Sequence, residues 1–300
     1  MGSTPTARTT AATVDVAADA TLPGVAVPSD VEARRAKAAT DNYATDEALR
    51  QRQALLAFAL PPPTPQPQLW DLFNWPPDAA VLDVGCGFGL WTRLAAERTA
   101  GGHVVGLDLS MAMLESLAAT VPTVLPVRAD GHRLPFADES FDVVLATWSL
   151  YHLPDKELAL GDIVRVLRPG GRLIAATNES TAVPLVDDVM ATSVEHVVGG
   201  RVEHWMEPLD FTLENGEEVL SSHFADVTRH VNETPYEVAD ASVLHGDACS
   251  LADPVMAETG MTREQFEHAV EHFDAAIATR LADGPLRFSR RTAFFVANAE

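Results

Sequence analysis

The chain is 300 residues long, and 47% of its residues are hydrophobic while 21% are charged. Such a chain can bury the core of one large globular domain, with or without an inserted cap. The formal net charge of −22 argues against a nucleic-acid partner, because no basic patch in the sequence offsets repulsion from a phosphate backbone.

The sequence also argues against membranes, secretion and disulfide bonds. No segment approaches the roughly 18 apolar residues that a membrane-spanning helix needs. The first 30 residues contain one basic residue, Arg8, and no apolar run, which argues against a signal peptide. The two cysteines, Cys86 and Cys249, are too few for a disulfide framework or a cysteine zinc site. We therefore expect a cytoplasmic protein.

The first 78 residues predict a tail and a lid. Residues 1–40 are rich in Ala, Thr, Pro and Asp with little periodicity, which predicts a disordered tail. Residues 41–78 predict an N-terminal helical lid, whose helix starts at the capping residue Thr45 and ends at Pro61.

Residues 79–178 alternate short apolar segments with helical ones. The pattern predicts strands at 80–84, 103–108, 123–127, 141–147 and 172–177, and helices at 90–98, 111–119 and 155–167. Such alternation predicts a parallel sheet covered by helices on both faces, in a doubly wound α/β layout.

The pattern is less regular beyond residue 178. Residues 179–218 predict a helical cap insertion, broken at Gly199 and Gly200. Residues 219–300 predict the C-terminal part of the core, with strands at 224–231 and 291–296 and a second helical cap segment at about 236–284.

A glycine-rich turn follows the first core strand. Gly85, Gly87 and Gly89 alternate with other residues, and glycine suits a turn where the backbone approaches a ligand closely. The dinucleotide-binding fingerprint would need a third glycine where Leu90 stands. The acid two residues before the turn, Asp83, suits a ligand with an ammonium group, which favours a methionine-bearing cofactor over NAD.

On these residues the segment 79–178 resembles the class I S-adenosylmethionine-dependent methyltransferases that act on small molecules. The glycine turn matches the first motif of that family. Asp108 matches the acid that bonds both ribose hydroxyls, and Asp130 matches the acid that accepts from the adenine amino group. The runs 134–142 and 167–171 are also typical of the family.

The resemblance implies a Rossmann-like, seven-stranded sheet that binds S-adenosyl-L-methionine and releases S-adenosyl-L-homocysteine. The expected cofactor-binding residues are Asp83, Gly85, Cys86, Gly87, Gly89, Asp108, Leu109, Met113, Asp130, Gly131 and Thr147. Within this set we expect Cys86 to be a small filler residue and not a nucleophile. Ser110 is expected to cap the following helix.

The acceptor side is predicted from the end of the fourth strand. His152 and Tyr151 follow that strand, and parallel sheets bind ligands at the carboxyl ends of their strands. His152 is either a general base or a packing residue that lines the cofactor; His196 and His204 in the cap are the other candidate bases. Tyr43 and Trp205 are expected to line the acceptor site.

A metal site is not expected. The run from His268 to His272 fits a zinc-peptidase pattern, but it lies in an acidic helix and chance explains it better.

The predicted function is methyl transfer to an O, N or C atom of a small-molecule metabolite, with natural-product biosynthesis as one setting. Two alternatives stay open: a non-methylating reaction such as cyclisation on the same fold, and a non-catalytic partner subunit. The intact acids and glycines argue against the second alternative. Both a monomer and a homodimer are compatible with the sequence.

Overall fold

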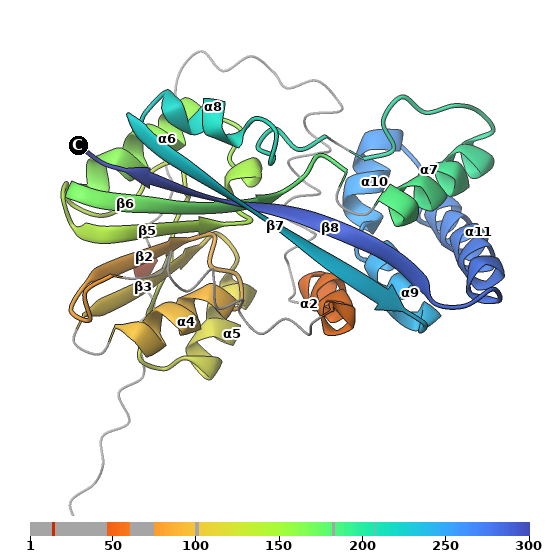
Figure 1. Cartoon of the computed structure of the whole chain (residues 1–300), viewed down its shortest axis with the longest axis horizontal. Coiled ribbons are helices and arrows are strands. Elements are labelled where there is room, and N and C mark those ends of the chain that lie inside the picture. The colour runs from red at the N-terminus through yellow and green to blue at the C-terminus, as the bar shows by residue number, and fades with distance from the viewer. Residues whose placement is uncertain (1–13, 16–46, 61–74, 100–101, 182–183, 207) are drawn as a thin grey trace, which may run out of the picture.

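The computed structural model describes residues 14–15, 47–60, 75–99, 102–181, 184–206 and 208–300. A twisted sheet with helices above and below it occupies one side of the molecule. Two long strands leave this sheet and reach a separate group of helices (Figure 1).

The sheet has the strand order β1-β4-β3-β2-β5-β6-β8-β7. Strands β1 to β6 run parallel, and β8 is antiparallel to both β6 and β7. The strands are β1 (Val14–Asp15), β2 (Ala80–Val84), β3 (His103–Asp108), β4 (Leu125–Arg128), β5 (Phe141–Thr147), β6 (Leu167–Asn178), β7 (Asp226–Val238) and β8 (Leu286–Asn298). The seven strands β2 to β8 confirm the predicted sheet, to which β1 adds a two-residue edge. The rest of the predicted tail lies outside the described residues.

Helices cover both faces of the sheet, as a doubly wound fold requires. The helices α4 (Leu90–Arg98) and α5 (Met111–Thr120) lie on one face, while α6 (Lys156–Val166) and α8 (Gly216–Ser221) lie on the other (Figure 1). The strand order reverses between β2 and β5, and doubly wound sheets bind ligands at the carboxyl ends of the strands beside such a reversal.

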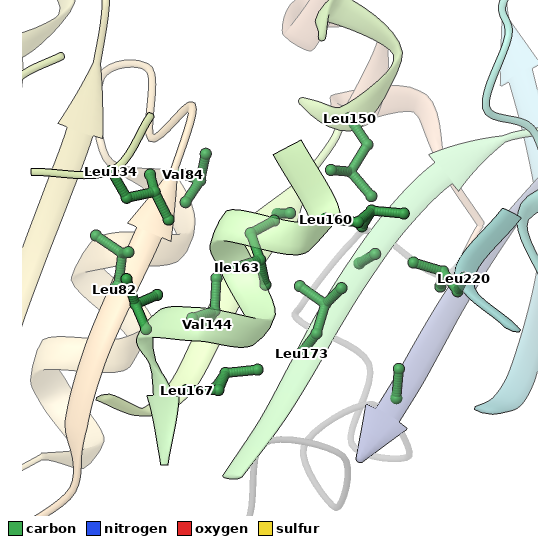
Figure 2. Packing of buried hydrophobic residues seen from close by; sticks show 14 of the residues in the cluster. Leu82, Val84, Leu134, Val144, Leu150, Leu160, Ile163, Leu167, Leu173 and Leu220 are labelled. Carbon is green, nitrogen blue, oxygen red and sulfur yellow. The ribbon is translucent and has the colours of Figure 1, made fainter. Parts of the chain in front are cut away.

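Alternating strand residues build a core on each face. On the α6 side, Leu82, Val144 and Leu173 pack under Leu160 and Ile163 of the helix, and all five are fully buried (Figure 2). The opposite face is packed by the intervening strand residues and by α4 and α5. Its buried members include Val81, Val143, Leu145, Leu114 and Leu117. The helices therefore fix the positions of the strand ends.

A second core forms the cap, from segments far apart in the chain. Its helices are α2 (Glu47–Ala54), the 3₁₀ helix η1 (Leu55–Phe58), α7 (Pro184–Val198), α9 (Ala241–Cys249), α10 (Ala252–Thr259) and α11 (Arg263–Leu281). Leu55, Val194, Leu244 and Phe273 are among its fully buried residues. A β7–β8 ribbon enters this core from the sheet.

The ribbon is longer than predicted. Pairing of β8 with β6 ends at Thr292, whereas pairing with β7 continues to Leu286 opposite Val238. The sequence prediction ended the first of these strands at Val231, whereas β7 continues through Pro235 to Val238. Proline is tolerated in this position because β7 is the edge strand of the sheet. The helical segment predicted from about residue 236 begins later, at Ala241 in α9, because residues up to Val238 belong to β7.

Other predictions need smaller changes. The predicted turn at 168–171 lies inside β6, where the register with β5 shifts between Phe141 and Val143 and Gly170 has a φ of 75°. Within the predicted helical segment 179–218, α7 ends at Val198, and the next described helix is α8. The predicted capping residue of the lid helix, Thr45, lies outside the described residues.

Candidate cofactor and acceptor site

The glycine turn between β2 and α4 has a backbone that other residues adopt rarely. Gly85, Gly87 and Gly89 have φ values of 72°, 54° and 91°. A Cβ atom on Gly85 would lie 2.5 Å from the Cβ of Ser149, and one on Gly89 would overlap the side chain of Leu117. Side chains are thus excluded from this turn both by backbone conformation and by neighbouring atoms.

Asp108, at the end of β3, is held against this turn by two backbone amides. One carboxylate oxygen accepts from the Gly87 amide at 2.9 Å, and the other accepts from the Ser110 amide at 2.8 Å. Burial raises the pKa of Asp108, and these hydrogen bonds oppose the rise. Ser110 also caps α5, as predicted, by accepting from the Met113 amide. Because each carboxylate oxygen has a second lone pair, Asp108 can still accept from two ligand hydroxyls.

Asp83 is a buried acid with one unsatisfied oxygen. Its side chain accepts a hydrogen bond from the Thr92 hydroxyl at 2.6 Å, and its other oxygen, Oδ1, has no partner. Desolvation raises the pKa of Asp83 to about 7, and the charge of Asp108 adds to the rise against the effect of the Thr92 hydrogen bond. A buried acceptor without a donor is costly. A ligand ammonium group would satisfy it.

Asp130, which follows β4, is oriented by a neighbour that the sequence prediction missed. Its Oδ1 accepts from the His132 amide at 2.9 Å and lies 2.7 Å from the His132 ring nitrogen Nδ1. Burial raises the pKa of Asp130, but the His132 interactions outweigh it and the net shift is downward. Asp130 stays 47% exposed, so its carboxylate remains open to a ligand. Only the contact identifies His132, because nothing in the sequence singles it out.

The chain bends sharply after β5, opposite the glycine turn. Trp148 has a φ of 54°, and its ring stacks on Trp91 with centroids 5.7 Å apart. The next residue, Ser149, is buried beside Gly85, and its hydroxyl has no partner. The sequence prediction also missed Ser149, although its position just past a parallel strand was a signal for a ligand contact.

His152 lies in the 3₁₀ helix η2 (Leu150–His152) that follows, with its ring 4.5 Å from that of Tyr151. Desolvation lowers the pKa of His152 to about 4, and the charges of Arg52 and Lys156 add to the effect, although part of the side chain is exposed. The imidazole is therefore neutral near pH 7, and a base with so low a pKa is weak at that pH. Since Arg52 belongs to α2, the lid helix brings a positive charge to this strand end.

The other candidate bases lie in the cap. His196 stacks on His272 of α11 at 4.4 Å, and His204 is exposed. The structure therefore groups His196 with α11 and not with the glycine turn. Over the described ranges, no group of three or more His, Cys, Asp and Glu residues is arranged to hold a metal ion. The catalytic roles of His152, His196 and His204 stay predictions.

The remaining predicted site residues vary in exposure. Leu109 is 59% exposed, whereas Met113 and Thr147 are buried. A Cβ atom on Gly131 would lie 3.0 Å from Leu153, so glycine suits that position.

Burial and the charges of Asp108 and Asp83 raise the pKa of the Cys86 thiol well above its ordinary value, which fits a filler residue. Trp205 packs against the cap core, and Tyr43 lies outside the described residues.

These features coincide with a known domain. Residues 82–175 match the family model of the methyltransferase domain, and the match includes the glycine turn, Asp108, Asp130 and His152. This segment is a methyltransferase domain. The prediction of a methyltransferase is thereby confirmed for this segment.

Relatives of the methyltransferase domain share part of the chain. Demethylmenaquinone methyltransferase of Lactiplantibacillus plantarum is 37% identical over 159 residues, which cover 49% of this chain and 65% of that protein. The enzyme of the same name from Staphylococcus aureus (strain JH9) is 36% identical over 123 residues, covering 39% and 51%. The chain thus spans between half and two thirds of these relatives.

A solved structure supports the fold. The YcgJ protein of Bacillus subtilis superposes with a TM-score of 0.50 at 16% identity, over 78% of this chain and 97% of that one. Among the helices that the structure describes, none has the length and apolarity needed to cross a membrane.

Proposed function

We propose that this chain transfers the methyl group of S-adenosylmethionine to an O, N or C atom of a small-molecule metabolite, with natural products as one substrate class. The observation that carries the proposal is the arrangement of Asp108 and Asp83 at the glycine turn. One carboxylate is fixed by two backbone amides, and the other is buried with an unpartnered oxygen. When bound, the cofactor supplies a methyl group that is already strongly electrophilic.

In this proposal three acids hold the cofactor. Asp108 accepts from the ribose hydroxyls, and Asp130 accepts from the adenine amino group. The unpartnered oxygen of Asp83 accepts from the ammonium group. The Ser149 hydroxyl is a further contact, because it is unpartnered and faces the backbone of Gly85. These residues offer the hydroxyl, amino and ammonium groups of the cofactor the acceptors that they need.

The acceptor side mainly has to position a nucleophile and exclude water. Such positioning contributes roughly 7–11 kcal/mol of barrier reduction in favourable cases. Where the acceptor must lose a proton, His152 is the candidate base at this strand end, but its lowered pKa keeps its contribution below the roughly 10²–10⁴-fold of a base whose pKa lies near the working pH. The cap covers this side of the sheet through α2, which contributes Arg52 near His152.

The relatives support a small-molecule acceptor, since their names refer to demethylmenaquinone. The net charge of −22 points the same way, because it disfavours a nucleic-acid acceptor. We place the enzyme in the cytoplasm, as a monomer or a homodimer.

Incubation with methyl-labelled S-adenosylmethionine and fractionated small-molecule extracts tests the proposal. We expect label in a small organic product, together with one equivalent of S-adenosylhomocysteine. Label found only in protein or RNA would contradict it. An isomerised product formed while the cofactor stays intact would instead establish a non-methylating reaction such as cyclisation.

A further inference from the structure

A cysteine, a histidine and an aspartate are joined by hydrogen bonds on the surface of the cap. Cys249 ends α9, His245 lies one turn earlier on the same helix, and Asp274 lies on α11. The Sγ atom of Cys249 is 3.4 Å from Nε2 of His245, and Nδ1 of the same ring is 2.9 Å from Oδ2 of Asp274. We name these three residues the cap thiol triad. The triad lies outside the segment that matches the methyltransferase domain.

The carboxylate of Asp274 decides which nitrogen of His245 carries the proton. A carboxylate only accepts hydrogen bonds, so Nδ1 is the donor in this contact. In the neutral ring Nε2 is then an acceptor, and the thiol of Cys249 donates to it. A nucleophile in contact with a base, which a third group orients in turn, is the arrangement that activates cysteine for attack.

The thiol of Cys249 stays protonated at rest. Burial raises its pKa and the charge of Asp274 adds to the rise, while the charge of Arg263 opposes it. Arg263 is 59% exposed and pairs with Asp253 at 3.4 Å. Because the thiolate is the nucleophile, Cys249 reacts slowly unless a base removes its proton, and His245 is in contact with it.

The cap thiol triad is accessible to small molecules. Cys249 is partly exposed, and the side chains of His245 and Asp274 are 51% and 42% exposed. The two partners of His245 bind different ring nitrogens, so the three side chains do not point at a common centre, as the ligands of a metal ion do. The arrangement therefore suits the chemistry of an accessible thiol with its own base.

We propose that the cap thiol triad is a modification site at which Cys249 reacts with a small-molecule disulfide. His245 takes the thiol proton as Sγ attacks one sulfur of the disulfide. A new S–S bond forms to Cys249 while the old one breaks, and the other half leaves as a thiolate that recovers the proton from His245. Cys249 is oxidised and the disulfide is reduced, so the exchange needs no other oxidant. Asp274 positions His245 and does not touch the disulfide.

The rate of reaction with a dithiodipyridine tests the proposal, because the released thiopyridone is followed by its absorbance. The full chain is used, and C249S gives the part of the rate that is due to Cys86. About 3% of an ordinary thiol is ionised at pH 7, so a base can accelerate the attack by at most about thirtyfold. In H245Q we expect the rate at Cys249 to fall by about tenfold at pH 7.

The pH profile distinguishes a base from a packing contact. In the wild type the rate should change by less than about threefold between pH 7 and pH 8, because the proton passes to His245 and not to solvent. In H245Q it should rise about tenfold per pH unit with the thiolate fraction. D274N should shift towards the H245Q profile, because an amide can donate to Nδ1 and so leave the proton on Nε2.

His268→Gln is the control, since it removes an exposed imidazole from the helix that carries Asp274. It should keep the wild-type rate and pH profile. With oxidised glutathione as a second disulfide, mass spectrometry should find one mixed disulfide, in the peptide that contains Cys249, and C249S should form none. D274N provides the comparison if H245Q does not fold.

A wild-type rate that equals that of H245Q at pH 7, or that rises tenfold per pH unit, would overturn the proposal and leave the triad as a packing contact. A mixed disulfide on Cys86 with none on Cys249 would also overturn it. These measurements follow thiol chemistry alone, so their outcome does not depend on whether the chain transfers a methyl group.

Discussion

The sheet core and the cap solve the problem of building a site in different ways. In the core, each of these predicted site residues lies at or just after the end of one strand: Gly85 after β2, Asp108 ending β3, Asp130 after β4 and His152 after β5. The positions of these residues follow from a regular parallel sheet, whose strand ends lie together.

In the cap, functional groups come together only through tertiary packing. The Arg52–Ser250 hydrogen bonds join residues 198 positions apart, and the ribbon brings Tyr236 against Ala59, just after η1. The comparison teaches that the cofactor half of the site depends on local backbone geometry. The acceptor half, which we propose lies under the cap, would depend instead on how α2, α9 and the ribbon pack.

Among the tests of this contrast, we expect the largest effect from a substitution of Asp108, which should weaken cofactor binding. Asp108→Asn replaces an acceptor of two hydroxyls with an amide that offers one acceptor oxygen. Charge-assisted hydrogen bonds contribute about 1.5–3 kcal/mol each, so S-adenosylhomocysteine should bind about 10²–10⁴-fold more weakly by calorimetry. Asp226→Asn, at an exposed acid that contacts Asn298 on the sheet edge, is the control and should bind normally. Equal affinities in the two variants would remove Asp108 from the cofactor site.

Substitutions in the core and in the cap should also differ in how they change the free energy of unfolding and the cofactor affinity. Phe273→Ala empties a fully buried position of the cap and should lower the free energy of unfolding by about 3–5 kcal/mol, with little change in cofactor affinity. Leu117→Ala should cost about 2–5 kcal/mol and also weaken cofactor binding, because Leu117 packs against the glycine turn at Gly89. Denaturant titrations and calorimetry measure both quantities. If the cap variant lost as much cofactor affinity as the core variant, the two halves would not be separable.

The buried acid Asp83 predicts a pH effect confined to the core. Its pKa is raised to about 7 from an ordinary 3.8, so the folded state keeps a proton that the unfolded state has lost. The contribution of Asp83 to the free energy of unfolding is fully present below about pH 4. It falls as the pH rises towards 7, and above that pH it no longer changes. Relative to Asp83→Asn, the wild type should lose about 3 kcal/mol between pH 5 and pH 8. A difference between the two proteins that stays constant over this range would contradict the assignment.

The smallest expected effect compares two glycines with the same backbone conformation. Gly85 and Gly199 have φ values of 72° and 75°, but only Gly85 has a neighbour that a Cβ atom would overlap. Gly199→Ala should cost about 1–2 kcal/mol from backbone conformation alone. Gly85→Ala should cost about 1–3 kcal/mol more, because Ser149 must move. Equal melting temperatures would show that the turn tolerates a side chain.

The same contrast explains what could be predicted from sequence. The bounds predicted for β3, β5 and α4 agree with the structure, because apolar runs there end at clear helix or turn signals. The ribbon was underestimated because Pro235 and the charged residues near Arg290 do not resemble a buried strand. Its extension depends on pairing with β7 and on contacts with the cap, which no local pattern reports.

For the site, the glycine turn, Asp83 and Asp108 were predictable because spacing and strand ends identify them. Ser149 and His132 were not, since one is recognised by its unpartnered hydroxyl and the other by its contact with Asp130.

Calorimetric titration of the purified chain with S-adenosylhomocysteine tests the central claim most directly. The account predicts a saturable heat with one site per chain, retained in D226N and lost in D108N over the same concentration range. Absence of any heat with either S-adenosylhomocysteine or S-adenosylmethionine would contradict it.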